Sequence, residues 1–198
     1  MAAGRLALWN DCLAQYAEDY EAWYAGEHLP ERLGLPGWLR GRRYEAVGSG
    51  PQFFTYYEVE APTVLVSGVY LERVNNPTPL THRIMSDAFR NMSRTVCTVE
   101  RVFGAMRGAW AVTLDRNVPL NIDRIADQAG VARVELWREA QVAQPAENVE
   151  SRLRGGDTTV QTCLFAETLR RADAERIAAS RPGARIYRFL CELEAPRP

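Results

Sequence analysis

The sequence predicts an α+β fold in which two tandem ferredoxin-like (βαββαβ) halves pack sheet to sheet as an α+β barrel. Short runs rich in Val, Leu, Phe, Tyr and Trp indicate strands, and helical patterns separate them at corresponding places in each half. The third run places large side chains on both faces, with Phe53 on one and Phe54 on the other. Helices can cover only one face of each half, so we expect the halves, 1–105 and 106–198, to cover each other.

Each expected strand is a short apolar run. The runs are Leu6–Cys12, Leu39–Val47, Phe53–Val59, Thr95–Phe103, Trp110–Leu114, Ala132–Trp137, Val160–Ala166 and Arg185–Leu193. The sequence Gly48-Ser49-Gly50 lies between the second and third runs and is typical of a hairpin turn.

Helical patterns link these strands. They cover Tyr16–Leu33, Thr63–Arg73 and Thr81–Met92 in the first half, and Ile122–Ala129 and Arg170–Ser180 in the second. Arg181-Pro182-Gly183 is a stop signal for the last helix. A polar insertion, Gln144–Asp157, is expected to form a surface loop. Both histidines lie in the first half, so we expect it to hold the chemistry and the second half to complete the barrel.

The composition excludes several classes of function. The net charge is -1 and no long Arg-rich block occurs, so a nucleic-acid partner is not expected. No apolar run reaches the roughly 18 residues needed to span a membrane, and no secretory signal is visible, so a cytoplasmic protein is expected. The chain contains no lysine, which excludes Schiff-base catalysis and a Walker-A phosphate loop.

The metal-binding and cofactor-binding signals are equally sparse. The cysteines are widely spaced, and the sequence has no CxxC, HxH or HxxxH pattern that would suit a metal. Buried free thiols in a reducing compartment are the expected state of these cysteines. No GxGxxG motif opens a strand–helix unit. We therefore expect neither a metal nor an organic cofactor.

The most informative stretch is Trp23–Arg32, which places His28 beside a carboxylate and near aromatic side chains. Histidine can exchange a proton near neutral pH. Tyr24 shares a helix face with His28, whereas the adjacent Glu27 diverges by about 100°. Pro30 kinks or restarts the helix at this point. We expect His28 to be an acid or base at the break, with Tyr24 and Glu27 beside the substrate; the alternative is a structural histidine that caps the helix.

Other residues complete the set of candidates, each with a structural alternative. Asp11, at the end of the first strand, is either an acid–base group or a cap. His82, near a helix start, is either a second titrating group or a solvated residue. Trp9 is either a substrate wall or part of the core. Arg43 either binds a substrate oxygen or pairs with a nearby glutamate, and Tyr57 offers a buried hydroxyl that needs a partner.

Two segments carry a resemblance to a known family. Tyr24–Leu33 followed by Leu35–Tyr44 is similar to an aromatic-x-x-x-His-x-Pro helix motif, and Asn76–Arg83 with Phe89–Asn91 accompanies it. Both resemble the EthD-like branch of the dimeric α+β barrel superfamily. Its members include polyketide cyclases, lactone isomerases, dehydratases, decarboxylases, quinone-forming monooxygenases and haem-degrading enzymes. The resemblance implies that a histidine, here His28, acts as acid or base with a nearby Tyr or Asp.

Three hypotheses follow. The first is a cofactor-independent acid–base enzyme of the isomerase, cyclase, dehydratase or lyase type, acting on a small carbonyl, lactone or aromatic polyketide-like substrate. The second is a non-catalytic small-ligand-binding or stress-response module. The third is a haem- or oxygen-dependent enzyme of the monooxygenase type. The tandem plan removes the need to dimerise for barrel closure but leaves a homodimer through outer faces open.

Overall fold

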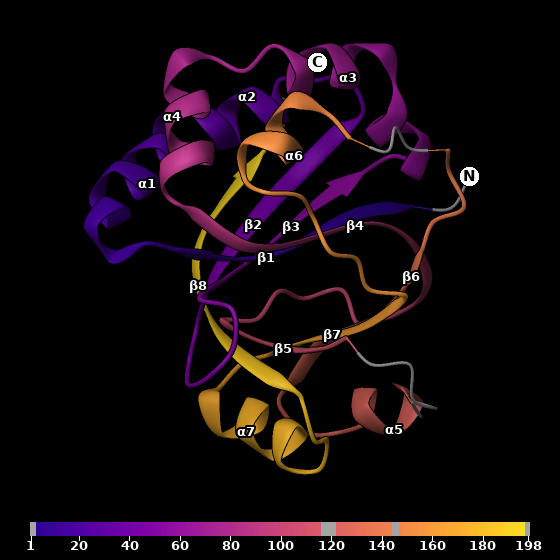
Figure 1. The fold of residues 1–198 in the computed structure, drawn as a ribbon. Helices are drawn as coiled ribbons and strands as arrows, with labels where there is room; N and C mark the ends of the chain where they lie inside the picture. Colours follow the sequence, from indigo (N-terminus) through magenta and orange to yellow (C-terminus); the bar gives the residue numbers. More distant parts are fainter. Residues whose placement is uncertain (1–2, 116–121, 144–146, 197–198) are drawn as a thin grey trace.

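The computed structural model describes residues 3–115, 122–143 and 147–196, and a closed barrel lies at its centre (Figure 1). The strands are β1 (Gly4–Cys12), β2 (Trp38–Ala46), β3 (Phe53–Val59), β4 (Phe89–Phe103), β5 (Trp110–Leu114), β6 (Val131–Glu139), β7 (Thr162–Thr168) and β8 (Arg185–Glu194). They close in the order β1-β3-β2-β8-β5-β7-β6-β4 with antiparallel pairing. Each predicted strand is present, and the predicted α+β barrel is confirmed.

The two halves of the barrel have the same strand order. The strands of the first half lie in the order β4-β1-β3-β2, and those of the second half lie in the order β8-β5-β7-β6. In each half the last strand is followed by the first, the third and the second. The halves join where β2 pairs with β8 and where β4 pairs with β6. Strand β4 is 15 residues long, and it pairs with β1 along one part and with β6 along another. Both halves therefore have ferredoxin-like topology, and one chain closes the barrel.

Aromatic side chains fill the barrel interior. The buried rings are those of Trp9, Tyr44, Phe54, Tyr56, Trp137, Phe165 and Tyr187. The Phe54 ring stacks on Trp9 with centroids 5.1 Å apart and on Trp137 with centroids 6.4 Å apart. Side chains alternate along β1, so Trp9 points into the barrel while Leu8 belongs to the core on the outer face. The expectation that Trp9 is a substrate wall therefore fails, because its ring is part of the barrel core.

Two fully buried carboxylates accompany these rings. Glu135 accepts two hydrogen bonds from Arg5, and Glu167 accepts one from the Tyr44 hydroxyl at 2.6 Å. Arg42 lies 3.0 Å from Glu167, so both charges have cationic partners. Because a buried charge is tolerated only when it is paired and hydrogen-bonded, we assign this cluster a structural role.

Helices cover the outside of the barrel in two groups (Figure 1). The first half carries α1 (Ala17–Trp23), a π-helix η2 (Tyr24–His28), α2 (Leu29–Leu33), α3 (Gly68–Asn75) and α4 (Pro79–Asp87), together with α6 (Val149–Leu153) from the second half. The second half carries α5 (Ile122–Ala126) and α7 (Arg171–Ala179). Short 3-10 helices lie at Ala14–Tyr16 and Pro62–Val66. Among the described residues, no helix is long and apolar enough to cross a bilayer.

Two predicted helices differ from the structure at their ends. The helix predicted over Thr81–Met92 stops at Asp87, because Phe89 pairs with Cys12 of β1 and begins β4. The helix predicted over Thr63–Arg73 is divided at Ser67, whose hydroxyl accepts a hydrogen bond from the Tyr70 amide and caps α3. All four cysteines are free thiols; Cys97 and Cys163 are buried as predicted, whereas Cys12 and Cys191 are half-buried.

Candidate functional site

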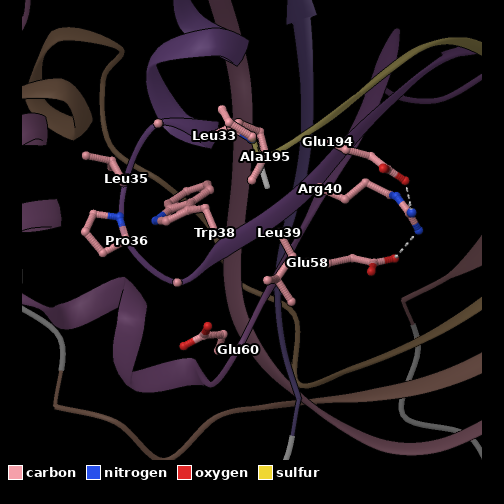
Figure 2. Close-up of a pocket in the computed structure, with 13 residues that line it drawn as sticks. Leu33, Leu35, Pro36, Trp38, Leu39, Arg40, Glu58, Glu60, Glu194 and Ala195 are labelled. Carbon is pink, nitrogen blue, oxygen red and sulfur yellow. Dashed lines mark hydrogen bonds and ion pairs between the residues drawn. The ribbon is translucent and has the colours of Figure 1, made fainter. Parts of the chain in front are cut away.

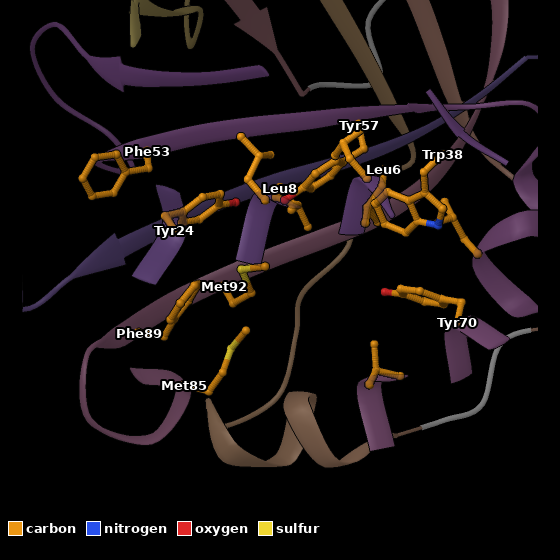
Figure 3. Close-up of a cluster of buried hydrophobic side chains, with 14 of the residues drawn as sticks. Leu6, Leu8, Tyr24, Trp38, Phe53, Tyr57, Tyr70, Met85, Phe89 and Met92 are labelled. Carbon is orange, nitrogen blue, oxygen red and sulfur yellow. The ribbon is translucent and has the colours of Figure 1, made fainter. Parts of the chain in front are cut away.

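A small, partly open cavity lies between the outer sheet face of the first half and the helices that cover it. Its volume is about 30 Å³, which is enough for about two water molecules. Its lining comprises Leu6, Leu8, Asn10, Tyr24, His28, Arg32, Tyr57, Tyr70, Met85, Phe89, Met92, Arg94, Glu150 and Arg154. Figure 3 shows the hydroxyls of Tyr24, Tyr57 and Tyr70 directed into the space between the sheet and the helices. Three of the predicted site residues, Tyr24, His28 and Tyr57, therefore meet here.

The π-helix between α1 and α2 positions two of these residues. The Leu29 amide donates to the Tyr24 carbonyl, five residues back, instead of the four of an α-helix. Pro30 follows at the start of α2 and has no amide hydrogen, so it leaves the next helical bond unmade. The wider turn brings the Tyr24 and His28 rings together with centroids 5.2 Å apart. The sequence predicted a helix break here, and the structure shows a π turn, a feature that is frequent at functional sites.

His28 is buried in an apolar environment with one ring nitrogen unpaired. Its side chain is 6% exposed, its ring lies 4.3 Å from that of Trp23, and Nδ1 has no hydrogen-bond partner among the described residues. Burial, followed by the charges of Arg32 and other arginines, holds the pKa of His28 well below its usual value. The imidazole is therefore neutral at neutral pH, with one nitrogen able to accept a proton.

Tyr57 supplies a second polar group. Its residue is 1% exposed, and its hydroxyl lies beside the hydroxyl of Tyr24. Burial raises the pKa of Tyr57 well above its usual value, and the nearby Tyr24 adds to that effect. Tyr57 is therefore a protonated phenol and a hydrogen-bond donor throughout the neutral range. A neutral base and a neutral acid face the same cavity.

The polar insertion of the second half completes the cavity, which the sequence did not predict. Its residues 144–146 lie outside the described residues, but α6 follows and brings Glu150 and Arg154 into the lining. Arg32 donates to Glu150 at 2.5 Å, and Arg154 forms two hydrogen bonds to Asp157 at 2.7 Å. The capping box of Asn148 with the helix that follows was the available signal for a helix in this insertion.

Arg43 and Glu27 lie just behind the cavity. The Arg43 guanidinium packs on the Tyr24 ring at 3.8 Å and bonds both carboxylate oxygens of Glu21, at 2.7 and 3.0 Å. Glu27 accepts hydrogen bonds from the hydroxyls of Thr78 and Thr81. Neither residue lines the cavity, so they are placed to hold Tyr24 and the π-helix rather than to contact a substrate.

Asp11 and His82 do not line the cavity either. The Asp11 carboxylate accepts from the Gln52 amide and from the Asn91 side chain, both at 2.7 Å, so it fixes the end of β1. His82 is exposed on α4. The expected acid–base roles of both residues therefore lack support from their positions, and the structural alternatives fit them better.

A larger groove of about 570 Å³ lies open on the surface beside the loop that joins α2 to β2 (Figure 2). Its charged residues are largely satisfied by one another, because Arg40 pairs with Glu58 and Glu194, as the dashed lines in Figure 2 show. No titratable group with a strongly shifted pKa faces it in the described part of the chain. The small cavity beside His28 is therefore the stronger candidate for chemistry.

The cavity does not fit a metal or haem. No group of three or more potential ligands from His, Cys, Asp and Glu occurs among the described residues. Haem iron lies at the centre of its macrocycle, so an axial His28 would require most of the porphyrin to fit beside it. The 30 Å³ present are far below the roughly 300–1,000 Å³ of sites for drug-sized ligands.

No family model and no curated protein matches the chain. Solved structures match its fold at low sequence identity. An anthrone oxidase-like protein aligns with a TM-score of 0.63 and 10% identity over 99% of this chain and 94% of its own. A candidate chlorite dismutase gives 0.56 and 10% over 96% of each chain, and a candidate monooxygenase from Fusobacterium nucleatum gives 0.55 and 10% over 100% and 99%. The chain thus has the dimeric α+β barrel fold, with both halves in one polypeptide.

Proposed function

We propose that the protein catalyses the oxygen-dependent oxidation of an enolisable aromatic compound of the anthrone type, without a metal or organic cofactor. The observation that carries this proposal is the pairing of a neutral His28, with Nδ1 unpaired, and a protonated Tyr57 in one cavity. The structural likeness to proteins described as an anthrone oxidase-like protein and a monooxygenase supports this reaction over a lyase or isomerase. Membership of the EthD-like branch and a homodimer stay predictions.

The chemistry balances with dioxygen alone. An anthrone carries a CH₂ group between two aromatic rings, and the quinone product carries a C=O group there. The CH₂ group loses four electrons and O₂ accepts four, so one oxygen atom enters the product and the other leaves as water. No external reductant is required, which agrees with a cavity that suits no cofactor.

The two cavity groups match the first step of this reaction. His28 Nδ1 accepts the proton that leaves the CH₂ carbon, and the Tyr57 hydroxyl donates a hydrogen bond to the ring oxygen where negative charge develops. The electron-rich anion then reacts with O₂. The CH₂ carbon and the oxygen lie on opposite sides of the central ring, so this ring must lie between His28 and Tyr57, and side chains of the cavity wall must move to admit it.

Oxygen uptake with anthrone, corrected for spontaneous oxidation, tests the proposal. We expect wild type to consume one O₂ per quinone formed and His28→Ala to lower kcat by about 10²-fold or more. His82→Ala is the matched control, because His82 is exposed on α4, and it should keep the wild-type rate. Uptake by wild type no faster than buffer would overturn the proposed reaction, and an active His28→Ala would remove His28 from it.

A further inference from the structure

We infer that Arg154 selects a substrate that bears a carboxylate, a deepening that rests on the proposed function. Arg154 comes from the polar insertion of the second half, and its side chain is 4% exposed. Nε and Nη2 bond the two oxygens of Asp157 at 2.7 Å. On the other edge, the contacts of Nη1 within the described part of the chain are Met85 Sδ at 3.6 Å and a Glu150 oxygen at 3.9 Å.

The Nη1 group of Arg154 lacks a strong hydrogen-bond acceptor among the described residues. A thioether sulfur is a weak acceptor, and Glu150, which accepts from Arg32 through Oε1 at 2.5 Å, keeps Oε2 at 3.9 Å from Nη1, beyond hydrogen-bond distance. A buried charged donor without a strong acceptor is costly, and an anionic oxygen of a ligand would satisfy it. Because the Arg154 side chain lines the cavity, the ligand oxygen would lie within the site itself.

The position of Arg154 also explains how a substrate larger than the cavity could bind. Arg154 and Met92 line both the small cavity and an open surface groove of about 470 Å³ beside Gly155 and Thr158. The central ring of a substrate could therefore lie in an enlarged cavity while an outer ring extends into the groove. A substrate carboxylate located where the cavity opens into the groove would contact Arg154 Nη1. The Asp157 carboxylate would compete with it for the guanidinium.

A matched pair of inert probes tests this selection. Anthraquinone-2-carboxylate and anthraquinone-2-carboxamide resemble the product, do not react further and differ in charge. Isothermal titration should show that wild type binds the carboxylate about tenfold or more tightly than the amide, as expected for one charge-assisted hydrogen bond. Arg154→Gln should remove this preference while binding of the amide changes little. Arg152→Gln, an exposed change in the same helix, is the control and should keep it.

Asp157→Asn provides an independent arm, because it removes the competing carboxylate and should tighten binding of the anthraquinone carboxylate severalfold. If Arg154→Gln does not fold, the Asp157→Asn variant decides. The inference is overturned if Asp157→Asn binds the anthraquinone carboxylate no more tightly than wild type does. Equal affinity of wild type for both probes also overturns it. If neither probe binds but anthrone is oxidised, the inference alone fails, whereas loss of both binding and oxidation removes the proposed function as well.

Discussion

At the scale of single residues, the proposed reaction depends on keeping His28 neutral. Its imidazole is surrounded by rings and by the charges of Arg32, Arg154 and Arg43, all of which oppose a proton. The neighbouring Tyr57 is held protonated by the same burial. One environment thus holds His28 neutral and Tyr57 protonated, which are the protonation states that the proposed reaction needs.

The same environment predicts a pH-dependent stability. The pKa of His28 is lowered on folding, so between its unfolded value near 6.5 and its folded value the unfolded chain binds more protons. The contribution of neutral His28 is present above pH 6.5 and is lost as the pH falls, by up to about 1.4 kcal/mol for each pH unit. Urea unfolding at pH 7 and pH 5.5 should show a smaller stability loss for His28→Gln than for wild type. His82→Gln, at the exposed position, should lose as much stability between the two pH values as wild type. A stability loss in His28→Gln equal to that of wild type would contradict a lowered pKa for His28.

At the scale of elements, the π-helix is the structure that brings Tyr24 and His28 together, and its glycine is open to a simple test. Gly26 is exposed, and an added Cβ would meet no atom within 4 Å. Alanine is more favourable than glycine in a helical segment by about 0.5–1 kcal/mol. We expect Gly26→Ala to raise the free energy of unfolding by about that amount and to leave anthrone oxidation unchanged.

Gly41 on β2 gives the opposite result for the same change. A Cβ there would lie 2.6 Å from Leu29 Cδ1 and 2.8 Å from Tyr57 Cε1. Gly41→Ala should therefore destabilise the protein by about 1–3 kcal/mol through overpacking and should also lower the oxidation rate, because Tyr57 must move. Thermal unfolding and oxygen uptake measure both effects, and a stabilised, fully active variant would show that the wall beside Tyr57 is looser than the structure indicates.

The elements also show what the sequence could and could not predict. Local periodicity predicted the helix that carries Tyr24 and His28, because its information lies within a few residues. The change to π hydrogen bonding left no signal except Pro30. The helix predicted to reach Met92 was wrong at its end, because pairing with the distant β1 strand determined where β4 begins. Arg154 was missed because its place in the cavity depends on how α6 packs against the first half, although its charged contacts Glu150 and Asp157 lie within four residues of it in the sequence.

At the scale of the whole molecule, the cavity needs both halves of the chain. The first half supplies the sheet face and the π-helix, and the second sends α6 across to supply Glu150 and Arg154. The contact between Arg32 and Glu150 joins residues 118 positions apart. The sequence predicted the barrel correctly from the repeated strand order, but contacts across such separations could not be read from it.

Closure of one barrel from both halves predicts that the chain unfolds as one cooperative unit. The Phe54 ring on β3 contacts Trp9 from its own half and Trp137, Phe165 and Tyr187 from the other. Removing it leaves a cavity at the junction of the halves, so Phe54→Ala should cost about 3–5 kcal/mol.

Urea unfolding followed by tryptophan fluorescence and by far-UV circular dichroism provides the measurement. We expect coincident single transitions in wild type, and in Phe54→Ala a shift of both signals to lower urea by the same amount. Val69→Ala, at an exposed position on α3, is the control and should leave the midpoint nearly unchanged. Two separate transitions would mean that each half is stable without the other, and the aromatic interior would then be an interface between two domains rather than the shared core of one.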